Sequence, residues 1–104
     1  MTYRILRHPD VGQDLEDIAD LIMAYAGVDI AIRKLDQIET TLNGLSKTPH
    51  IGSLRDAIVP GLRVIPSASK AVICFVVDDS AKEVLVLAIG YTGSDWVRHV
   101  SRRN

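Results

Sequence analysis

The chain has 104 residues, 47% of them hydrophobic and 24% charged, which fits one folded domain over residues 1–104 and excludes a disordered or low-complexity protein. Its net charge of −1 argues against a strong electrostatic grip on nucleic acid, so direct nucleic-acid binding is not expected. The first residues lack the regions of a signal peptide, and no apolar stretch approaches the roughly 18 residues of a membrane span, so we expect a cytoplasmic protein without a membrane partner.

A short strand is predicted over residues 2–7, where apolar and polar side chains alternate. The next segment has a helix signature, because Pro9 suits a first helical position and Gly27 is a natural stop. One apolar stripe at helical spacing runs between them: Val11, Leu15, Ile18, Ile22 and Tyr25. The other side of this helix is polar and mostly acidic.

A second amphipathic helix follows after about two residues, and Asp29 is its predicted cap. Its apolar stripe is Ile32, Leu35, Ile38, Leu42 and Leu45. Pro49 closes the segment. Two helices joined by so short a connection run antiparallel, so we expect a helical hairpin whose apolar stripes share one target.

The rest of the chain predicts a loop and then an antiparallel sheet. Residues 50–60 form the loop, and a strand over 62–65 ends or becomes an edge at Pro66. Two fully apolar runs, 71–77 and 84–89, are joined by a polar connection of hairpin length.

These two apolar runs carry the main functional clue. Side chains alternate between the faces of a sheet, so a strand that is apolar throughout needs cover on both faces. Only two helix-length segments are evident elsewhere in the chain. We therefore expect the helical hairpin to cover one face and much of the other face to be left for a partner.

Few residue patterns point to catalysis or metal binding. His8, His50 and His99 fall in separate segments without a ligand spacing, so no metal site and no cofactor are expected. Ser67 to Lys70 matches Ser-x-x-Lys but lies between strands, not on a helix. Asp14 and Asp17 share a helix side with no third group in sight, so solvation is the better interpretation.

Cys74 lies inside the more apolar strand and is predicted to be a buried structural thiol with a raised pKa. As the only cysteine it forms no internal disulfide, which fits a reducing compartment. The C-terminus is different. Trp96 accompanies a basic group, Arg98, His99, Arg102 and Arg103, which either grips an acidic or nucleic-acid surface or is a frayed soluble end.

The predicted order of elements, a strand, a helical hairpin and then three strands, resembles that of the ParE/RelE superfamily of bacterial toxins. Two short sequence matches add to this resemblance. These matches are Asp14-Leu-Glu-Asp-Ile18 in the first helix and Val59-Pro-Gly-Leu-Arg63 before the apolar strand pair. The resemblance spans Tyr3 to about Asp95 and is closest to the ParE branch, often called plasmid stabilisation proteins. It implies an α+β fold with a strand, an antiparallel helical hairpin and a three-stranded antiparallel sheet.

The resemblance also implies a toxin of a type II toxin-antitoxin system with a cognate antitoxin as its partner. The antitoxin would supply the missing cover over 71–77 and 84–89, and without it the chain is open to self-association. Relatives of the ParE kind bind DNA gyrase, whereas relatives of the RelE kind cleave messenger RNA in the ribosome. A member that has lost toxicity and only binds its antitoxin is a third alternative.

The chain departs from the family at the end of its last strand, where Ile89-Gly-Tyr-Thr-Gly93 lacks the usual basic residues. RNA cleavage is therefore disfavoured, and we expect a binding toxin without catalytic residues. The expected partner or target contacts are Arg63, Lys70, Trp96, Arg98 and Arg102. The candidates for the endoribonuclease alternative are Arg63, Lys70, Tyr91 and Arg98.

Overall fold

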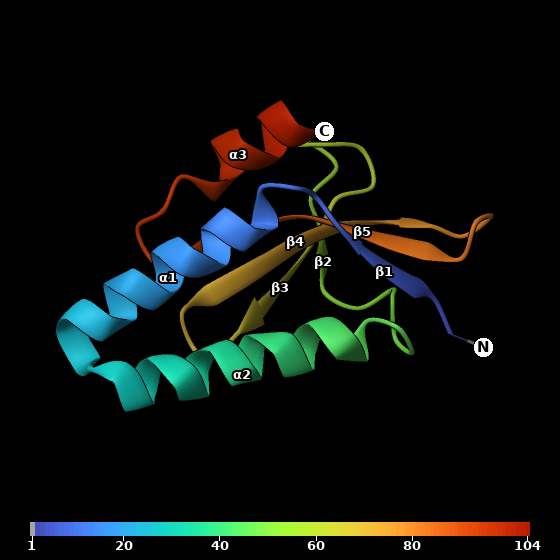
Figure 1. Cartoon of the computed structure of the whole chain (residues 1–104). Coiled ribbons are helices and arrows are strands. Elements are labelled where there is room, and N and C mark those ends of the chain that lie inside the picture. The colour runs from blue at the N-terminus through green and yellow to red at the C-terminus, as the bar shows by residue number, and fades with distance from the viewer. Residues whose placement is uncertain (1) are drawn as a thin grey trace.

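The computed structural model describes residues 2–104, which form three helices and five strands (Figure 1). In chain order the elements are β1 (Arg4–Arg7), α1 (Val11–Ala26), α2 (Val28–Gly44), β2 (Ser53–Leu54), β3 (Arg63–Ser67), β4 (Ala71–Asp78), β5 (Glu83–Tyr91) and α3 (Trp96–Arg103). The α+β class is as predicted. Within the described residues, every helix is too short or too polar to span a membrane.

All five strands belong to one mixed sheet with the order β1-β5-β4-β3-β2. β1 pairs parallel with β5, and the other neighbours pair antiparallel. The predicted three-stranded antiparallel sheet is therefore incomplete at both edges. The strand β1 was expected, but its pairing with β5 was not. The strand β2 lies in the predicted loop and, with two residues, is too short to give a periodic signal.

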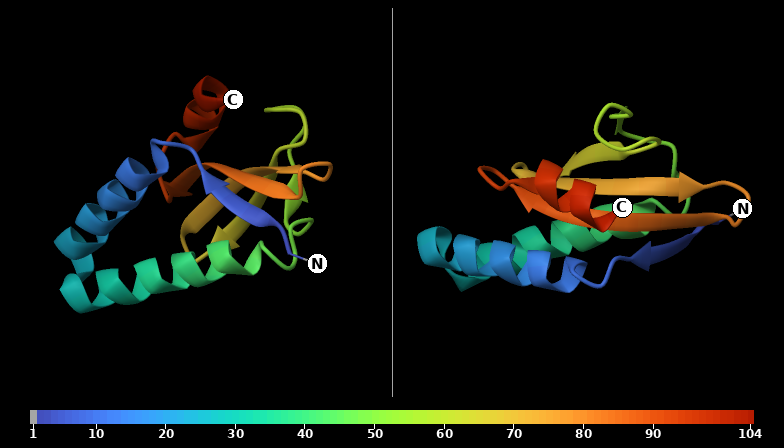
Figure 2. Two further views of the ribbon diagram at one scale, coloured as in Figure 1. Left: turned by 45° about the vertical axis from the view of Figure 1, so that its right-hand side comes forward. Right: turned by 90° about the horizontal axis from the view of Figure 1, so that it is seen from above.

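The helices α1 and α2 lie side by side on one face of the sheet and bury the larger core (Figures 1 and 2). Ile18, Ile22 and Leu42 of the predicted stripes are buried there, but Tyr25 and Ile32 are 55% and 54% exposed. These two residues lie near the closed end of the hairpin, which extends beyond the sheet (Figure 1). The stripe predictions are therefore wrong at that end.

The start of α2 also differs from the prediction. The helix begins at Val28, directly after Gly27, whose φ of 92° is a conformation that favours glycine. Asp29 lies inside the first turn and is not the cap. It remains well placed there, because a carboxylate in the first turn complements the helix dipole.

The other face of the sheet is covered in part by α3 and by the loop before β3 (Figure 2). Val100 of α3 and Leu62 of the loop are fully buried against Cys74 and Leu87 of the sheet. The expectation that much of this face is left for a partner is therefore wrong around Cys74 and Leu87, whereas Val76 and Leu85 on the same face are only partly buried. The basic C-terminus is not a frayed end, because it forms an eight-residue helix whose Val100 is buried.

A bulge in β5 changes which of its side chains face each core. Phe75 lies opposite Val86 and Cys74 lies opposite Ala88, so Leu87 is an extra residue in the ladder. The extra residue shifts the alternation of side chains. Val86 and residue 89 then both face the helical hairpin, while Leu87 and Ala88 both contribute to the second core.

Candidate functional site

The second half of β5 has an edge that no strand within residues 2–104 covers, because β1 ends opposite Val86. Side chains take the place of a neighbouring strand there. The backbone N–H of Ile89 donates to Asp14 Oδ2 at 3.0 Å, and the N–H of Tyr91 donates to Ser94 Oγ at 2.9 Å. Arg103 Nη1 donates to the carbonyl of Leu87 at 3.1 Å. The edge is therefore satisfied by α1, α3 and the connection before α3.

Asp14 and Arg103 form a bidentate ion pair at the centre of this edge. Arg103 Nη1 donates to Oδ2 at 2.6 Å and Nη2 donates to Oδ1 at 2.9 Å. Only 5% of the Asp14 side chain and 11% of the Arg103 side chain are exposed. The hydrogen bonds to Asp14 raise the pKa of Arg103 above its ordinary value. The interpretation of Asp14 as a solvated carboxylate is therefore wrong, because Asp14 is buried and paired with Arg103.

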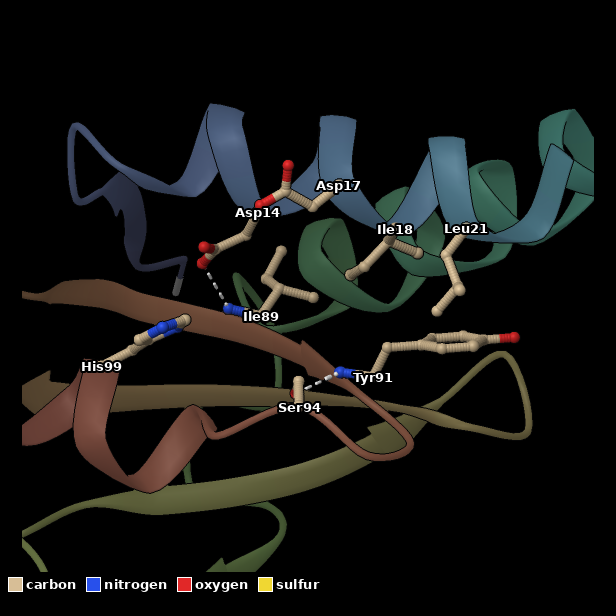
Figure 3. A pocket seen from close by; sticks show the side chains of 8 residues that line it. All are labelled: Asp14, Asp17, Ile18, Leu21, Ile89, Tyr91, Ser94 and His99. Atoms are coloured by element: carbon tan, nitrogen blue, oxygen red, sulfur yellow. Dashed lines mark hydrogen bonds between the residues drawn. The ribbon is translucent and has the colours of Figure 1, made fainter. Parts of the chain in front are cut away.

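A small pocket opens beside this ion pair, between α1, the end of β5 and α3 (Figure 3). Its volume is about 100 Å³. Leu21 projects from α1 toward the ring of Tyr91, Ile18 projects toward Ile89, and His99 approaches from α3 (Figure 3). An apolar floor with a few polar groups at its rim suits an anchoring side chain from a binding partner.

Two of the predicted site residues, Lys70 and Tyr91, lie close together, and both contact Tyr25. The hydroxyl groups of Tyr25 and Tyr91 are 2.6 Å apart, and Lys70 Nζ lies 5.5 Å from the centroid of the Tyr25 ring. Burial and the hydrogen bond to Tyr25 raise the pKa of Tyr91 to about 12. A phenol in this state is poorly suited to accept a proton near neutral pH.

The other predicted site residues lie elsewhere. Arg63 is at the opposite end of β3 from Lys70 and donates to the carbonyl of His50 at 3.0 Å. Arg98 pairs with Asp95 at 3.1 Å within the start of α3. Trp96 packs over a glycine of β5, and Arg102 lines a cavity at the far end of α3. These residues do not form one site.

A polar cluster that the sequence did not reveal lies at the turn between β4 and β5. Asp79 Oδ1 accepts the hydroxyl of Tyr3 at 2.7 Å and lies 2.7 Å from His50 Nε2. The hydrogen bond from Tyr3 lowers the pKa of Asp79 and raises the pKa of Tyr3. No spacing in the chain links the three residues, because they come from three separate segments.

Large apolar side chains are exposed together near the closed end of the α1–α2 hairpin. We call this group the hairpin-end patch: Leu21, Met23, Tyr25, Val28 and Ile32, which are 40–58% exposed. Leu21 belongs also to the pocket and Tyr25 contacts Tyr91, so the patch continues into the candidate site. Several large apolar side chains exposed at one end of a molecule are a feature of protein-binding sites.

Cys74 is fully buried, and burial raises the pKa of its thiol to about 12, which confirms the predicted structural role. Within residues 2–104 no cluster of three or more His, Cys, Asp or Glu side chains is arranged to hold a metal ion.

Replacing Gly90 by alanine is expected to destabilise the docked α3 by about 1–3 kcal/mol, because a Cβ there would lie 2.7 Å from Cβ of Trp96. Urea unfolding followed by the fluorescence of Trp96, the only tryptophan, measures the effect. Gly12→Ala is the matched control, since nothing lies within 4 Å of its added methyl group and we expect a gain of about 0.5–1 kcal/mol. Equal changes in both variants would contradict the close packing.

Comparison with known proteins points in one direction. The family described as "ParE toxin of type II toxin-antitoxin system, parDE" matches residues 5–96. No curated protein matches the chain in sequence at a significant level.

Several solved structures share the fold, among them the following three. The chromosomal ParDE toxin-antitoxin system of P. aeruginosa matches with a TM-score of 0.72 and 22% identity, covering 86% of this chain and 95% of that one. A mutant of the E. coli toxin RelE in the free state matches with a TM-score of 0.65 and 16% identity, covering 98% of this chain and 96% of that one. The toxin-antitoxin complex RelBE2 of Mycobacterium tuberculosis matches with a TM-score of 0.56 and 18% identity, covering 88% of this chain and 99% of that one.

Proposed function

Because the chain belongs to the ParE family of toxins of type II toxin-antitoxin systems, we propose that it inhibits DNA gyrase by binding it and that a cognate antitoxin neutralises it. The hairpin-end patch carries this proposal. Five large apolar side chains that are 40–58% exposed on two adjoining helices are costly in water and are stabilised when a partner covers them.

The placement of the charged candidates also supports binding over RNA cleavage. Cleavage needs a proton acceptor and cations gathered around one phosphate. Arg63 begins β3 whereas Lys70 lies in the turn after its other end, and Arg98 is paired with Asp95 at the start of α3. Lys70 and Tyr91 are close to each other, but Tyr91 is a buried residue and its hydroxyl is bonded to Tyr25.

Expression of the chain without its antitoxin is expected to arrest bacterial growth, and the purified chain is expected to inhibit DNA supercoiling by gyrase. Co-expression of the cognate antitoxin is expected to restore growth. The supercoiling assay measures the target directly, and boiled protein is the control for non-specific inhibition.

The other two alternatives give different results in the same cells. New cleavage sites in transcripts, with unchanged supercoiling, would favour the endoribonuclease and overturn the gyrase proposal. Normal growth together with tight antitoxin binding would favour a member that has lost toxicity.

A further inference from the structure

A second cavity lies between the start of α1 and the end of α3, and the proposed function does not use it. Its volume is about 320 Å³, and its lining is His8, Asp10, His99, Arg102 and Arg103. Four of these five side chains carry nitrogen donors. They come from the two ends of the chain, and the ion pair between Asp14 and Arg103 holds α1 and α3 together beside them.

The hydrogen-bond partners separate the occupied donors from the free ones. Arg103 is occupied, because it binds Asp14 and its Nε lies 3.7 Å from Asp10 Oδ2. Arg102 makes no ion pair within 4.0 Å with any residue of 2–104. His8 Nδ1 accepts the backbone N–H of Asp10 at 3.1 Å, so the neutral ring carries its proton on Nε2.

We propose that this cavity binds the phosphate group of a phosphate monoester. Arg102 supplies the charge-assisted hydrogen bonds, because a guanidinium matches two phosphate oxygens at once. His8 supplies a neutral N–H donor, and His99 lines the same space. Asp10 is also the N-cap of α1 without a side-chain cap bond, so the positive end of that helix dipole adjoins the cavity.

The carboxylate of Asp10 repels an incoming anion, so the proposal predicts opposite changes in phosphate affinity for variants of Asp10 and Arg102. Its carboxylate is 63% exposed, and the nearest cations are Arg103 and, when protonated, His8. Removing its charge leaves the donors of the cavity in place. We therefore expect Asp10→Asn to tighten phosphate binding and Arg102→Gln to weaken it.

The test is an NMR titration of the whole ¹⁵N-labelled chain with inorganic phosphate and with a nucleoside 5′-monophosphate. We expect saturable shifts at the amides of residues 8–12 and 99–103. Arg102→Gln should weaken binding at least about tenfold, the equivalent of one hydrogen bond to a charged group. Arg98→Gln is the matched control, since Arg98 is exposed on the same helix but lies outside the cavity.

A dinucleotide that lacks a terminal phosphate serves as the second ligand control. It should bind more weakly than inorganic phosphate and more weakly than the nucleoside 5′-monophosphate. Tighter binding of the nucleotide than of inorganic phosphate would add a nucleotide preference to the proposal. Three results would overturn it: no saturable phosphate binding, an equal loss in Arg98→Gln, or equal binding of the dinucleotide. The measurement uses no toxicity readout, so its failure leaves the proposed function untouched.

Discussion

Asp14→Ala is expected to lower the free energy of unfolding by about 3–5 kcal/mol, the largest single effect on stability that we predict. The variant leaves the Arg103 guanidinium, which is 11% exposed, without its bidentate partner and also leaves the N–H of Ile89 unpaired. Removing one member of a buried pair costs more than the net value of the pair, because the remaining charge stays desolvated. Thermal and urea unfolding measure the loss.

Asp17→Ala is the matched control for this prediction. Asp17 lies on the same side of α1 and lines the pocket, but it is exposed and outside the ion pair. We expect a change within about 0.5 kcal/mol. The double variant Asp14→Ala with Arg103→Ala should lose less than the sum of its single variants, since the two residues interact directly. Similar melting of the Asp14 and Asp17 variants would show that the ion pair does not hold α3 in place.

Ile32→Arg is expected to weaken binding of the cognate antitoxin by roughly 30- to 1,000-fold, which corresponds to about 2–4 kcal/mol. Ile32 belongs to the hairpin-end patch and is 54% exposed, so the substitution places a charge where we propose that a partner covers apolar surface. Its exposure also means that the fold tolerates the change. Calorimetric titration of the purified toxin with its antitoxin measures the affinity.

Leu54→Arg is the control, because Leu54 is 55% exposed but lies on β2, at the far edge of the sheet from β1. It should bind the antitoxin nearly as the parent chain does. A loss of affinity in the Leu54 variant with none in the Ile32 variant would place the antitoxin on the other edge. Growth rescue by co-expressed antitoxin should follow the same order as the affinities.

The predicted site residues show how far sequence reasoning reaches. Lys70 and Tyr91 were proposed as members of one alternative site, and the structure brings them together through Tyr25, which was interpreted only as part of an apolar stripe. Arg63 and Arg98 were assigned to the same alternative but lie apart from them. Residue type suggested the candidates, whereas only the packing of the hairpin end against β5 decides which of them meet.

The Gly90 to Gly93 segment is a second example. From the sequence it is a place where the family's basic residues are missing. In the structure Gly90 is also where Trp96 packs so closely that a Cβ would not fit, so the segment serves as the docking surface of α3. A side-chain contact of this kind leaves no periodic signal, because it depends on one residue pair.

The sequence alone determined the two long helices, the two apolar strands and the family. The helices follow from apolar residues that repeat at 3.6 positions, the strands from unbroken apolar runs, and the family from the order of elements along the chain. The tertiary structure decided the position of β1, the docking of α3 and the state of Asp14. Asp14 is buried only because β1 ends at residue 7 and Arg103, 89 positions away, folds back to meet it. Contacts between such distant residues follow from how the elements pack, and no local pattern encodes them.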